Sequence, residues 1–297
     1  MKKMKIGIYG QFYHEDADIS IQILLEALYD KNIIVFIEEN FLKLIIRHKK
    51  INEKYTNFST FKNLDSSFDL FFTIGGDGTI LKSIMYIKDL NIPLAGINTG
   101  RLGFLASIQK DEIAHSVTQI LNGNYCISER SLLSIDTFPK NKKLNTLNFA
   151  LNEISVIRKN TTSMIKVETF LNDEYLTSYW SDGLIISTPT GSTGYSLSCG
   201  GPILDPSTNS LILTPIAPHN LNARPIVIPD TTEVKLKVSG REKKYLVSLD
   251  SRIATLTNET TITIKKSPFT IKMIQLNDES FIKTLRKKLL WGEDKRN

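Results

Sequence analysis

The sequence predicts an α/β protein with an N-terminal Rossmann-like parallel α/β domain and a C-terminal, predominantly β domain. Up to residue 124, short apolar runs alternate with segments of helical periodicity. From residue 125 the segments are short, rich in β-branched and aromatic residues, and separated by Asn, Asp, Gly and Pro. The end of the chain returns to a helical pattern. We therefore expect domains at 1–124 and 125–275, and a helix within 276–297 that returns to the N-terminal domain and packs back on the core.

In the first half, apolar runs predict strands and 3.6-residue periodicity predicts helices. The strands are almost continuously apolar, which is typical of a parallel sheet covered on both faces. The expected strands are Lys5–Tyr9, Ile33–Ile37, Asp69–Ile74 and Pro93–Ile97, and the expected helices are Ala17–Lys31, Thr79–Asp89 and Asp111–Leu121.

In the second half, we expect a series of short strands and, at Lys140–Asn145, a hairpin tip. In the closing segment Ser280–Trp291, apolar residues share one side of a helix, which favours a capping helix over one lying on a membrane. The expected strands are Cys126–Phe138, Thr146–Arg158, Ile165–Leu171, Glu174–Trp180, Leu184–Thr188, Leu211–Pro215, Glu233–Val238, Tyr245–Leu249 and Thr260–Ile264.

Composition argues against several classes of protein. No apolar run approaches the ~20 residues that cross a bilayer, and no apolar segment follows the basic start, so we expect a cytoplasmic protein. The two cysteines and four histidines lack metal-site spacing. The net charge of +6 comes without a nucleic-acid-binding motif, which favours a solvated basic surface and no nucleic-acid partner.

A glycine-rich loop, Gly75-Gly76-Asp77-Gly78-Thr79, separates an expected strand from an expected helix. Such a turn lies where open α/β sheets bind ligands, and its amides and helix N-terminus suit a phosphate. Thr79 is a candidate N-cap or phosphate contact, and Lys82 could add positive charge. The spacing is neither GxxxxGK[ST] nor GxGxxG. A carboxylate among phosphate-binding amides indicates either a base in phosphoryl transfer or a residue that shapes the turn.

This loop resembles the GGDGT signature of a kinase superfamily that includes NAD kinases, diacylglycerol and sphingosine kinases and, more distantly, 6-phosphofructokinases. Further segments, in the same order along the chain, are similar to those of bacterial-type NAD kinases. They are Asn98–Leu105, Leu151-Asn152-Glu153, Ser181–Ser198, Gly200–Ile203 and Pro218–Pro225.

The resemblance implies an ATP-dependent NAD kinase with Asp77 as general base. Asp77 would act on the 2′-hydroxyl of the adenosine ribose of NAD, which attacks the γ-phosphate of ATP. Mg²⁺ would accompany ATP, with no ligand supplied directly by the protein. The implied NAD-binding residues are Asp77, Gly78, Asn152, Glu153, Asp182 at the nicotinamide end, and Thr193, Gly194, Tyr195 and Ser198 around the adenine. The implied phosphate-binding residues are Gly75, Gly76, Gly78, Thr79 and Lys82.

Three positions depart from the family pattern. Gly194 replaces the usual Ala, Trp180 stands where many members carry a basic residue, and Arg252 stands at a position that is often Gln. Two alternatives stay open: a lipid or sugar kinase of the same superfamily, and a non-catalytic dinucleotide-binding regulator. The resemblance also implies a homodimer or homotetramer.

Overall fold

The computed structural model describes residues 3–11, 17–29, 31–47, 51–52, 54, 58–100, 102–145, 148–160, 163–277 and 279–291. His14, His48, Arg101 and the end of the predicted 276–297 segment lie outside these residues. The chain forms two compact units, Met1–Glu129 with Ile271–Asn297, and Arg130–Thr270. The chain passes from one to the other within the strands β6 (Cys126–Phe138) and β17 (Thr261–Gln275).

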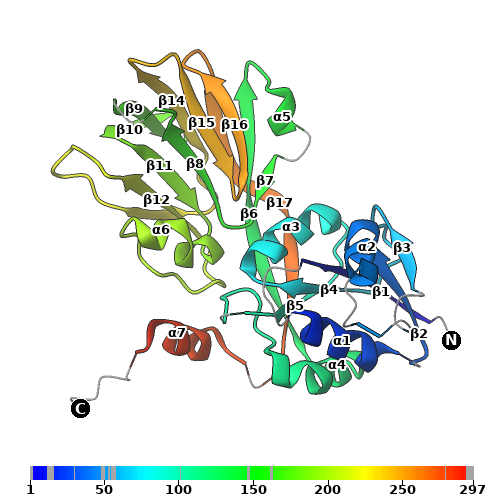
Figure 1. Cartoon of the computed structure of the whole chain (residues 1–297). Helices are drawn as coiled ribbons and strands as arrows, with labels where there is room; N and C mark the ends of the chain where they lie inside the picture. The colour runs from blue at the N-terminus through cyan, green and yellow to red at the C-terminus, as the bar shows by residue number, and fades with distance from the viewer. Residues whose placement is uncertain are drawn as a thin grey trace. The chain divides into compact units, whose positions relative to one another are not determined.

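The first unit contains a parallel sheet with the strand order β5-β4-β1-β2-β3. Its strands are β1 (Met4–Gly10), β2 (Ile33–Glu38), β3 (Ser59–Phe61), β4 (Leu70–Gly75) and β5 (Leu94–Asn98), and its helices are α1 (Ala17–Leu28), α2 (Glu39–Arg47), α3 (Asp77–Ile87), α4 (Ile113–Leu121) and α7 (Phe281–Leu289). Helices α1 and α4 lie side by side (Figure 1).

Helices cover both faces of this sheet, as the continuous apolar strands predict. Leu70, Phe72 and Ile74 of β4 share one hydrophobic cluster with α1, α2 and α4. On the opposite face, Ile80 of α3 packs so close to Gly96 of β5 that a Cβ there would lie 2.6 Å away. The expected parallel α/β architecture is therefore confirmed.

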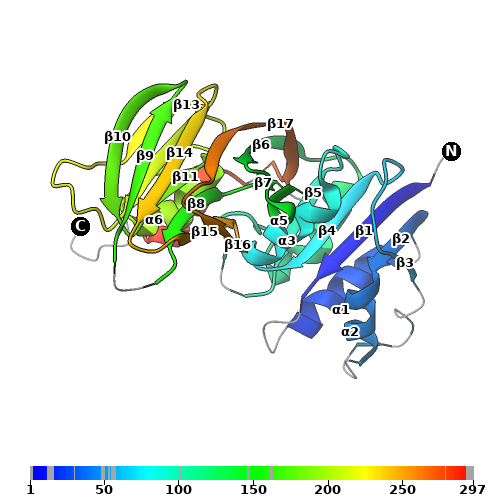
Figure 2. The same cartoon turned by 90° about the horizontal axis from the view of Figure 1, so that it is seen from above.

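The second unit is built from antiparallel strands in two layers, part of which Figure 2 shows from above. One sheet has the order β13-β12-β11-β8-β15-β16, and the other layer contains β10-β9-β14-β17 with β6 and β7. The remaining bounds are β7 (Phe149–Ala150), β8 (Glu153–Arg158), β9 (Ile165–Leu171), β10 (Glu174–Ser181), β11 (Gly183–Ser187), β12 (Ser210–Ile216), β13 (Ile226–Pro229), β14 (Val234–Gly240), β15 (Lys244–Leu249) and β16 (Arg252–Thr257). Alternating residues of both layers, such as Val156 and Val167, form one core.

Several elements differ from the expectation. The sequence reasoning missed α2, β3, β13 and β16. The predicted strand Thr146–Arg158 is interrupted, because β7 ends at Ala150 and β8 begins only at Glu153. A short helix, α5 (Lys142–Asn145), lies in the predicted hairpin tip, and a 3₁₀ turn (Thr190–Thr193) precedes α6 (Tyr195–Ser198).

Helix α7 is amphipathic and capped by Ser280, whose hydroxyl accepts from the Lys283 amide at 3.2 Å. Within the first unit, its Phe281 ring lies 6.4 Å from the ring of Phe104. None of the helices in the described part of the chain is long and apolar enough to cross a membrane.

Candidate active site

The glycine loop turns directly from β4 into α3. Gly75 has φ of +152°, and a Cβ there would lie 2.2 Å from Oγ1 of Thr79, so this position requires glycine. Gly76 occupies the N-cap position of α3, and Asp77 is the first helical residue. The helix thus begins two residues earlier than expected, and Thr79 is not its N-cap.

The carboxylate of Asp77 accepts three consecutive backbone amides. Oδ2 accepts from Phe104 at 2.8 Å, and Oδ1 accepts from Leu105 at 3.1 Å and Ala106 at 3.0 Å. The two oxygens of a carboxylate offer about four acceptor positions. Among the described residues, donors occupy three of these positions, which leaves one position on Oδ2 for a further donor.

The other residues predicted to contact phosphate differ in their burial and in their hydrogen-bond partners. Oγ1 of Thr79 is buried and has no hydrogen-bond partner within the described structure. Lys82 is exposed one turn into α3, and its Nζ donates to Oε1 of Gln11 at 3.1 Å. At Gly76 and Gly78 an added Cβ would have no atom of the described residues within 4 Å.

In the second unit, the turn Leu151–Glu153 is held from two sides. The Asp250 carboxylate accepts the amides of all three residues. Thr188 donates its hydroxyl to the Leu151 carbonyl at 2.6 Å and its amide to the Asn152 carbonyl at 2.9 Å. These contacts interrupt the strand predicted over Thr146–Arg158 at the polar residues Asn152 and Glu153.

Asn152 and Glu153 each present a buried oxygen without a partner in the described structure, Oδ1 and Oε2 respectively. The Tyr195 amide donates to the Glu153 carboxyl group. A Cβ on Gly194 would lie 3.3 Å from Oε2 of Glu153 and 3.5 Å from Nδ2 of Asn152, so the predicted residues converge here. Buried oxygens normally have a hydrogen-bond donor, so these two can accept from water, an ion or a ligand.

Burial controls the ionisation of Glu153. Removal from solvent, followed by the negative charge of Asp250, raises the pKa of Glu153 to about 8, while the bond from the Tyr195 amide opposes that rise. Burial also raises the pKa of Asp250. At neutral pH, Glu153 can therefore hold a proton and donate a hydrogen bond as well as accept one.

Asp182 lies in the bend between β10 and β11 and pairs with Arg158, whose Nη2 is 2.9 Å from Oδ2. Burial is the main cause that raises the pKa of the Tyr195 hydroxyl. The charges of Cys199 and then of Asp182 raise it further. Tyr195 is 38% exposed, and Ser198 is exposed at the end of α6. The Thr193 hydroxyl donates to the Thr190 carbonyl at 3.2 Å.

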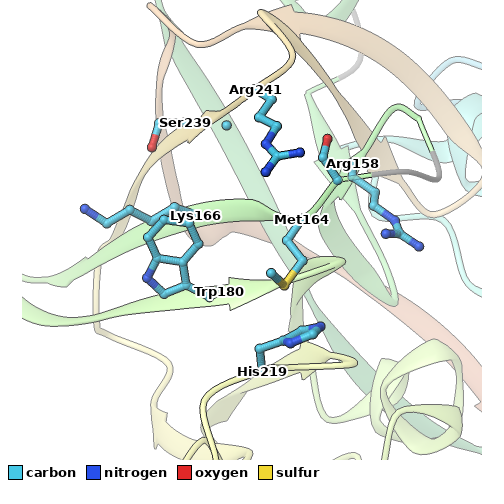
Figure 3. Close-up of a pocket in the computed structure, with 9 residues that line it drawn as sticks. Arg158, Met164, Lys166, Trp180, His219, Ser239 and Arg241 are labelled. Atoms are coloured by element: carbon cyan, nitrogen blue, oxygen red, sulfur yellow. The ribbon is translucent and has the colours of Figure 1, made fainter.

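Arg158 also lines an open pocket of about 770 Å³ in the second unit (Figure 3). Its walls combine basic and aromatic side chains with Met164. The His219 amide donates to the Trp180 carbonyl at 2.8 Å, so the backbones of these two residues are hydrogen-bonded to each other. The other lining residues are Ser163, Lys166, Ser239, Gly240 and Arg241.

Sequence reasoning missed three groups that shape these sites: the amides of 104–106, Arg158 and Asp250. Asp250 follows a predicted strand and has the local appearance of a turn residue. The predicted residues themselves fall into two sets. Gly75–Thr79 and Lys82 belong to the first unit, and Asn152, Glu153, Asp182 and Thr193–Ser198 belong to the second.

The chain matches two family models, the ATP-NAD kinase N-terminal domain over residues 6–125 and the ATP-NAD kinase C-terminal domain over residues 151–276. It is 64% identical to the NAD kinase of Christiangramia forsetii over 294 residues, which cover 99% of this chain and 100% of the relative. It is 58% identical to the NAD kinase of Flavobacterium psychrophilum, with the same coverage.

Solved structures share the fold at low sequence identity. Yeast NADH kinase, crystallised with NADH, matches with a TM-score of 0.82 at 21% identity over 98% of this chain and 88% of that one. An NAD kinase from Archaeoglobus fulgidus, in complex with ATP, matches with a TM-score of 0.71 at 24% identity over 97% and 99%. With both domain models matched in order and a relative 64% identical along its whole length, the chain belongs to the ATP-NAD kinase family.

Proposed function

We propose that this chain transfers the γ-phosphoryl group of ATP to the 2′-hydroxyl of the adenosine ribose of NAD, which gives NADP and ADP. The observation that carries the proposal is the fixed carboxylate of Asp77, which binds three amides and, within the described part of the chain, keeps one acceptor position on Oδ2. Membership of the ATP-NAD kinase family supports the choice of substrates.

Asp77 acts as the general base. The remaining acceptor position receives the 2′-hydroxyl proton as that oxygen forms a bond to the γ-phosphorus, and the bond from phosphorus to the bridging oxygen of ADP breaks. The three amides prevent the carboxylate from rotating, so its free position points in one direction. Such positioning accounts for much of the acceleration in phosphoryl transfer.

The loop around Asp77 binds the phosphates. Gly75, Gly76 and Gly78 bring backbone close to the ligand at the positive end of α3, and Lys82 adds charge one turn later. The unpartnered hydroxyl of Thr79 supplies a further donor or oxygen ligand.

ATP enters with Mg²⁺, which offsets phosphate charge when bound. In the part of the chain that is described, no three His, Cys, Asp or Glu side chains are grouped to hold a metal. Near this loop, Mg²⁺ would find the Thr79 hydroxyl and the phosphates of bound ATP. Both supply oxygen, the kind of ligand that Mg²⁺ prefers.

NAD is recognised by the second unit. Asn152 and Glu153 offer the unpaired oxygens and the donors that a ribose or adenine edge requires, and Glu153, protonated below about pH 8, can do both. Tyr195 stacks on the adenine with Thr193, Gly194 and Ser198 beside it. Asp182 accepts from the nicotinamide carboxamide, with Arg158 holding its orientation.

Incubation of the purified protein with ATP, Mg²⁺ and NAD tests the assignment. We expect NADP to form, and Asp77→Asn to lower kcat by about 10²–10⁴-fold, the usual contribution of a general base. Asp89→Asn, an exposed carboxylate just beyond the other end of α3, is the matched control and should leave kcat unchanged. Phosphorylation of a lipid or sugar with NAD untouched, or NAD binding without turnover, would overturn the proposal.

We also propose that the active form is a homodimer or homotetramer in the cytoplasm. Support for the assembly comes from the resemblance of the sequence to NAD kinases, which implies an oligomer. Multi-angle light scattering of the purified chain measures the mass directly, and a monomer at working concentration contradicts the proposal.

A further inference from the structure

Asp250 makes an unusual set of contacts for a residue in a hairpin turn. It lies between β15 and β16 with φ of +52°. Its Oδ2 accepts the Leu151 amide at 3.0 Å, and Oδ1 accepts the amides of Asn152 at 2.9 Å and Glu153 at 3.2 Å. In return, the Asp250 amide donates to the Glu153 carbonyl at 3.0 Å. Asp250 therefore binds the three backbone amides of the turn and one of its carbonyls.

The opposite side of the same turn is held by Thr188, through the carbonyls of Leu151 and Asn152. Gly191 closes over it, since a Cβ there would lie 2.0 Å from the Asn152 carbonyl oxygen. With its peptide groups occupied on both sides, the turn has one backbone arrangement. Oδ1 of Asn152 and Oε2 of Glu153 are consequently held in place although neither has a hydrogen-bond partner among the described residues.

This arrangement costs stability, because a carboxylate is buried close to a second carboxyl group. The pKa of Asp250 is raised by burial, although the three amides and Arg252 act in the opposite direction. An uncharged amide side chain has only one acceptor oxygen, whereas the three amides use both oxygens of the Asp250 carboxylate.

We propose that Asp250 is a positioning residue for dinucleotide recognition: with Thr188, it fixes the turn Leu151–Glu153 so that the free oxygens of Asn152 and Glu153 meet the substrate. Asp250 does not touch the substrate itself. This inference rests on the proposed function of the site, and it adds a residue outside the motif that carries the family resemblance.

The main test is Asp250→Asn, which removes the charge and one acceptor oxygen but keeps a residue type that tolerates positive φ. We expect KM for NAD to rise about tenfold or more, because the turn loses its charged acceptor, while KM for ATP stays within about twofold. The matched control is Asp173→Asn. Asp173 also has positive φ, lies in a hairpin of the same unit and pairs with Lys235, yet it is exposed. Both KM values should stay unchanged in this control.

A second readout separates positioning from general loosening. Glu153 faces the charge of Asp250 and the hydroxyl of Tyr195. In Asp250→Asn the Asp250 charge is gone, so the inflection that Glu153 gives near pH 8 in the pH profile of NAD affinity should move to lower pH. General loosening would also expose Glu153 to solvent and lower its pKa, so the movement is compared with that in Thr188→Val, which loosens the same turn but keeps the Asp250 charge. A larger movement in Asp250→Asn than in Thr188→Val is the result expected for the Asp250 charge.

Thr188→Val provides a variant that keeps Asp250. It deletes the hydroxyl that binds the Leu151 carbonyl, and we expect the same selective rise in KM for NAD, smaller in size. If Asp250→Asn does not fold, this variant decides. A KM for NAD within twofold of the wild-type value in the folded Asp250 variant, or in Thr188→Val when that variant decides, overturns the inference.

Calorimetric titration of NAD distinguishes this failure from failure of the proposed function. A wild-type protein without turnover refutes the kinase assignment, but weaker NAD binding in Asp250→Asn than in Asp173→Asn still supports positioning. Equal NAD affinity in those two variants refutes positioning, whatever the turnover.

Discussion

The backbone of Gly103 lies directly against the carboxylate of Asp77, so that a Cβ on Gly103 would lie 1.9 Å from Oδ1 and 2.6 Å from Cγ. The three amides that follow Gly103 all donate to that carboxylate. Glycine at this position is therefore what allows the segment to wrap around Asp77. The contact joins two segments that resemble separate motifs of the family into one structural unit.

Replacement of Gly103 by alanine should displace the Asp77 carboxylate. Overpacking of this kind costs about 1–3 kcal/mol, and a displacement of about 1 Å at a reacting group costs about 100-fold in rate. We expect kcat to fall about 100-fold, with a smaller change in the KM for NAD. Steady-state kinetics measures both, and circular dichroism confirms that the variant is folded. A folded Gly103→Ala enzyme with wild-type kcat would show that the position of the carboxylate is unimportant.

Phe281 of helix α7 should influence the rate through Phe104, although it is far from Asp77 in the sequence. The Phe104 ring contacts Phe281, and Nζ of Lys288 lies 5.7 Å from its centroid. The amide of the same Phe104 binds Asp77. An aromatic pair contributes about 0.5–1.5 kcal/mol, so Phe281→Ala should lower kcat by about 2–10-fold.

Ile282→Ala is the control for this prediction, because Ile282 is the next residue of α7 and is 58% exposed. It should leave kcat unchanged. An equal loss of activity in both variants would indicate that α7 acts only by general stabilisation.

The fold class could be predicted because its signal is local. Short segments of β-branched and aromatic residues between turn residues give β6 and β9 with the bounds that the structure has, and alternating strands and helices give the parallel sheet. Helix α2 was missed although Phe41, Leu42 and Ile45 face the core; it begins at Glu39, directly after β2 ends at Glu38, so no turn residue separates the two elements in the sequence.

The site could be predicted only in part, because its supports are not local. The glycine loop is visible in five consecutive residues. The break in the strand predicted at Thr146–Arg158 is caused by Asp250, 98 residues after Asn152, and no pattern near the turn reveals it. The same holds for Asp77, whose partners lie 27 to 29 residues away.

The stability of the folded chain should decrease with pH because of Glu153. Burial raises its pKa from an ordinary 4.5 to about 8, so between these values the folded chain holds a proton that the unfolded chain has lost. The stabilising contribution is fully present below pH 4.5 and lost as pH rises past about 8, with a slope of up to about 1.4 kcal/mol per pH unit.

Urea unfolding between pH 5 and pH 9 measures this dependence. Asp250, whose pKa is also raised, contributes with the same sign. Glu153→Gln isolates the Glu153 contribution, since it cannot ionise and should flatten the profile. A parallel profile in wild type and Glu153→Gln would contradict a raised pKa at this residue.

Two glycines in the 190–195 segment should differ in how well they tolerate replacement by alanine. At Gly191 a Cβ would lie 2.0 Å from the Asn152 carbonyl oxygen and 2.5 Å from its carbon, both backbone atoms that cannot move without opening the turn held by Asp250. At Gly194 the contacts would be 3.2 Å or longer, and φ is negative, at −95°. We expect Gly191→Ala to lose about 1–3 kcal/mol of unfolding free energy and to bind NAD weakly. Gly194→Ala, which restores the residue usual in the family, should stay near wild type in both. Chemical denaturation and NAD titration of the two variants side by side provide the measurement, and equal behaviour would show that the Asn152 turn can shift to admit a methyl group.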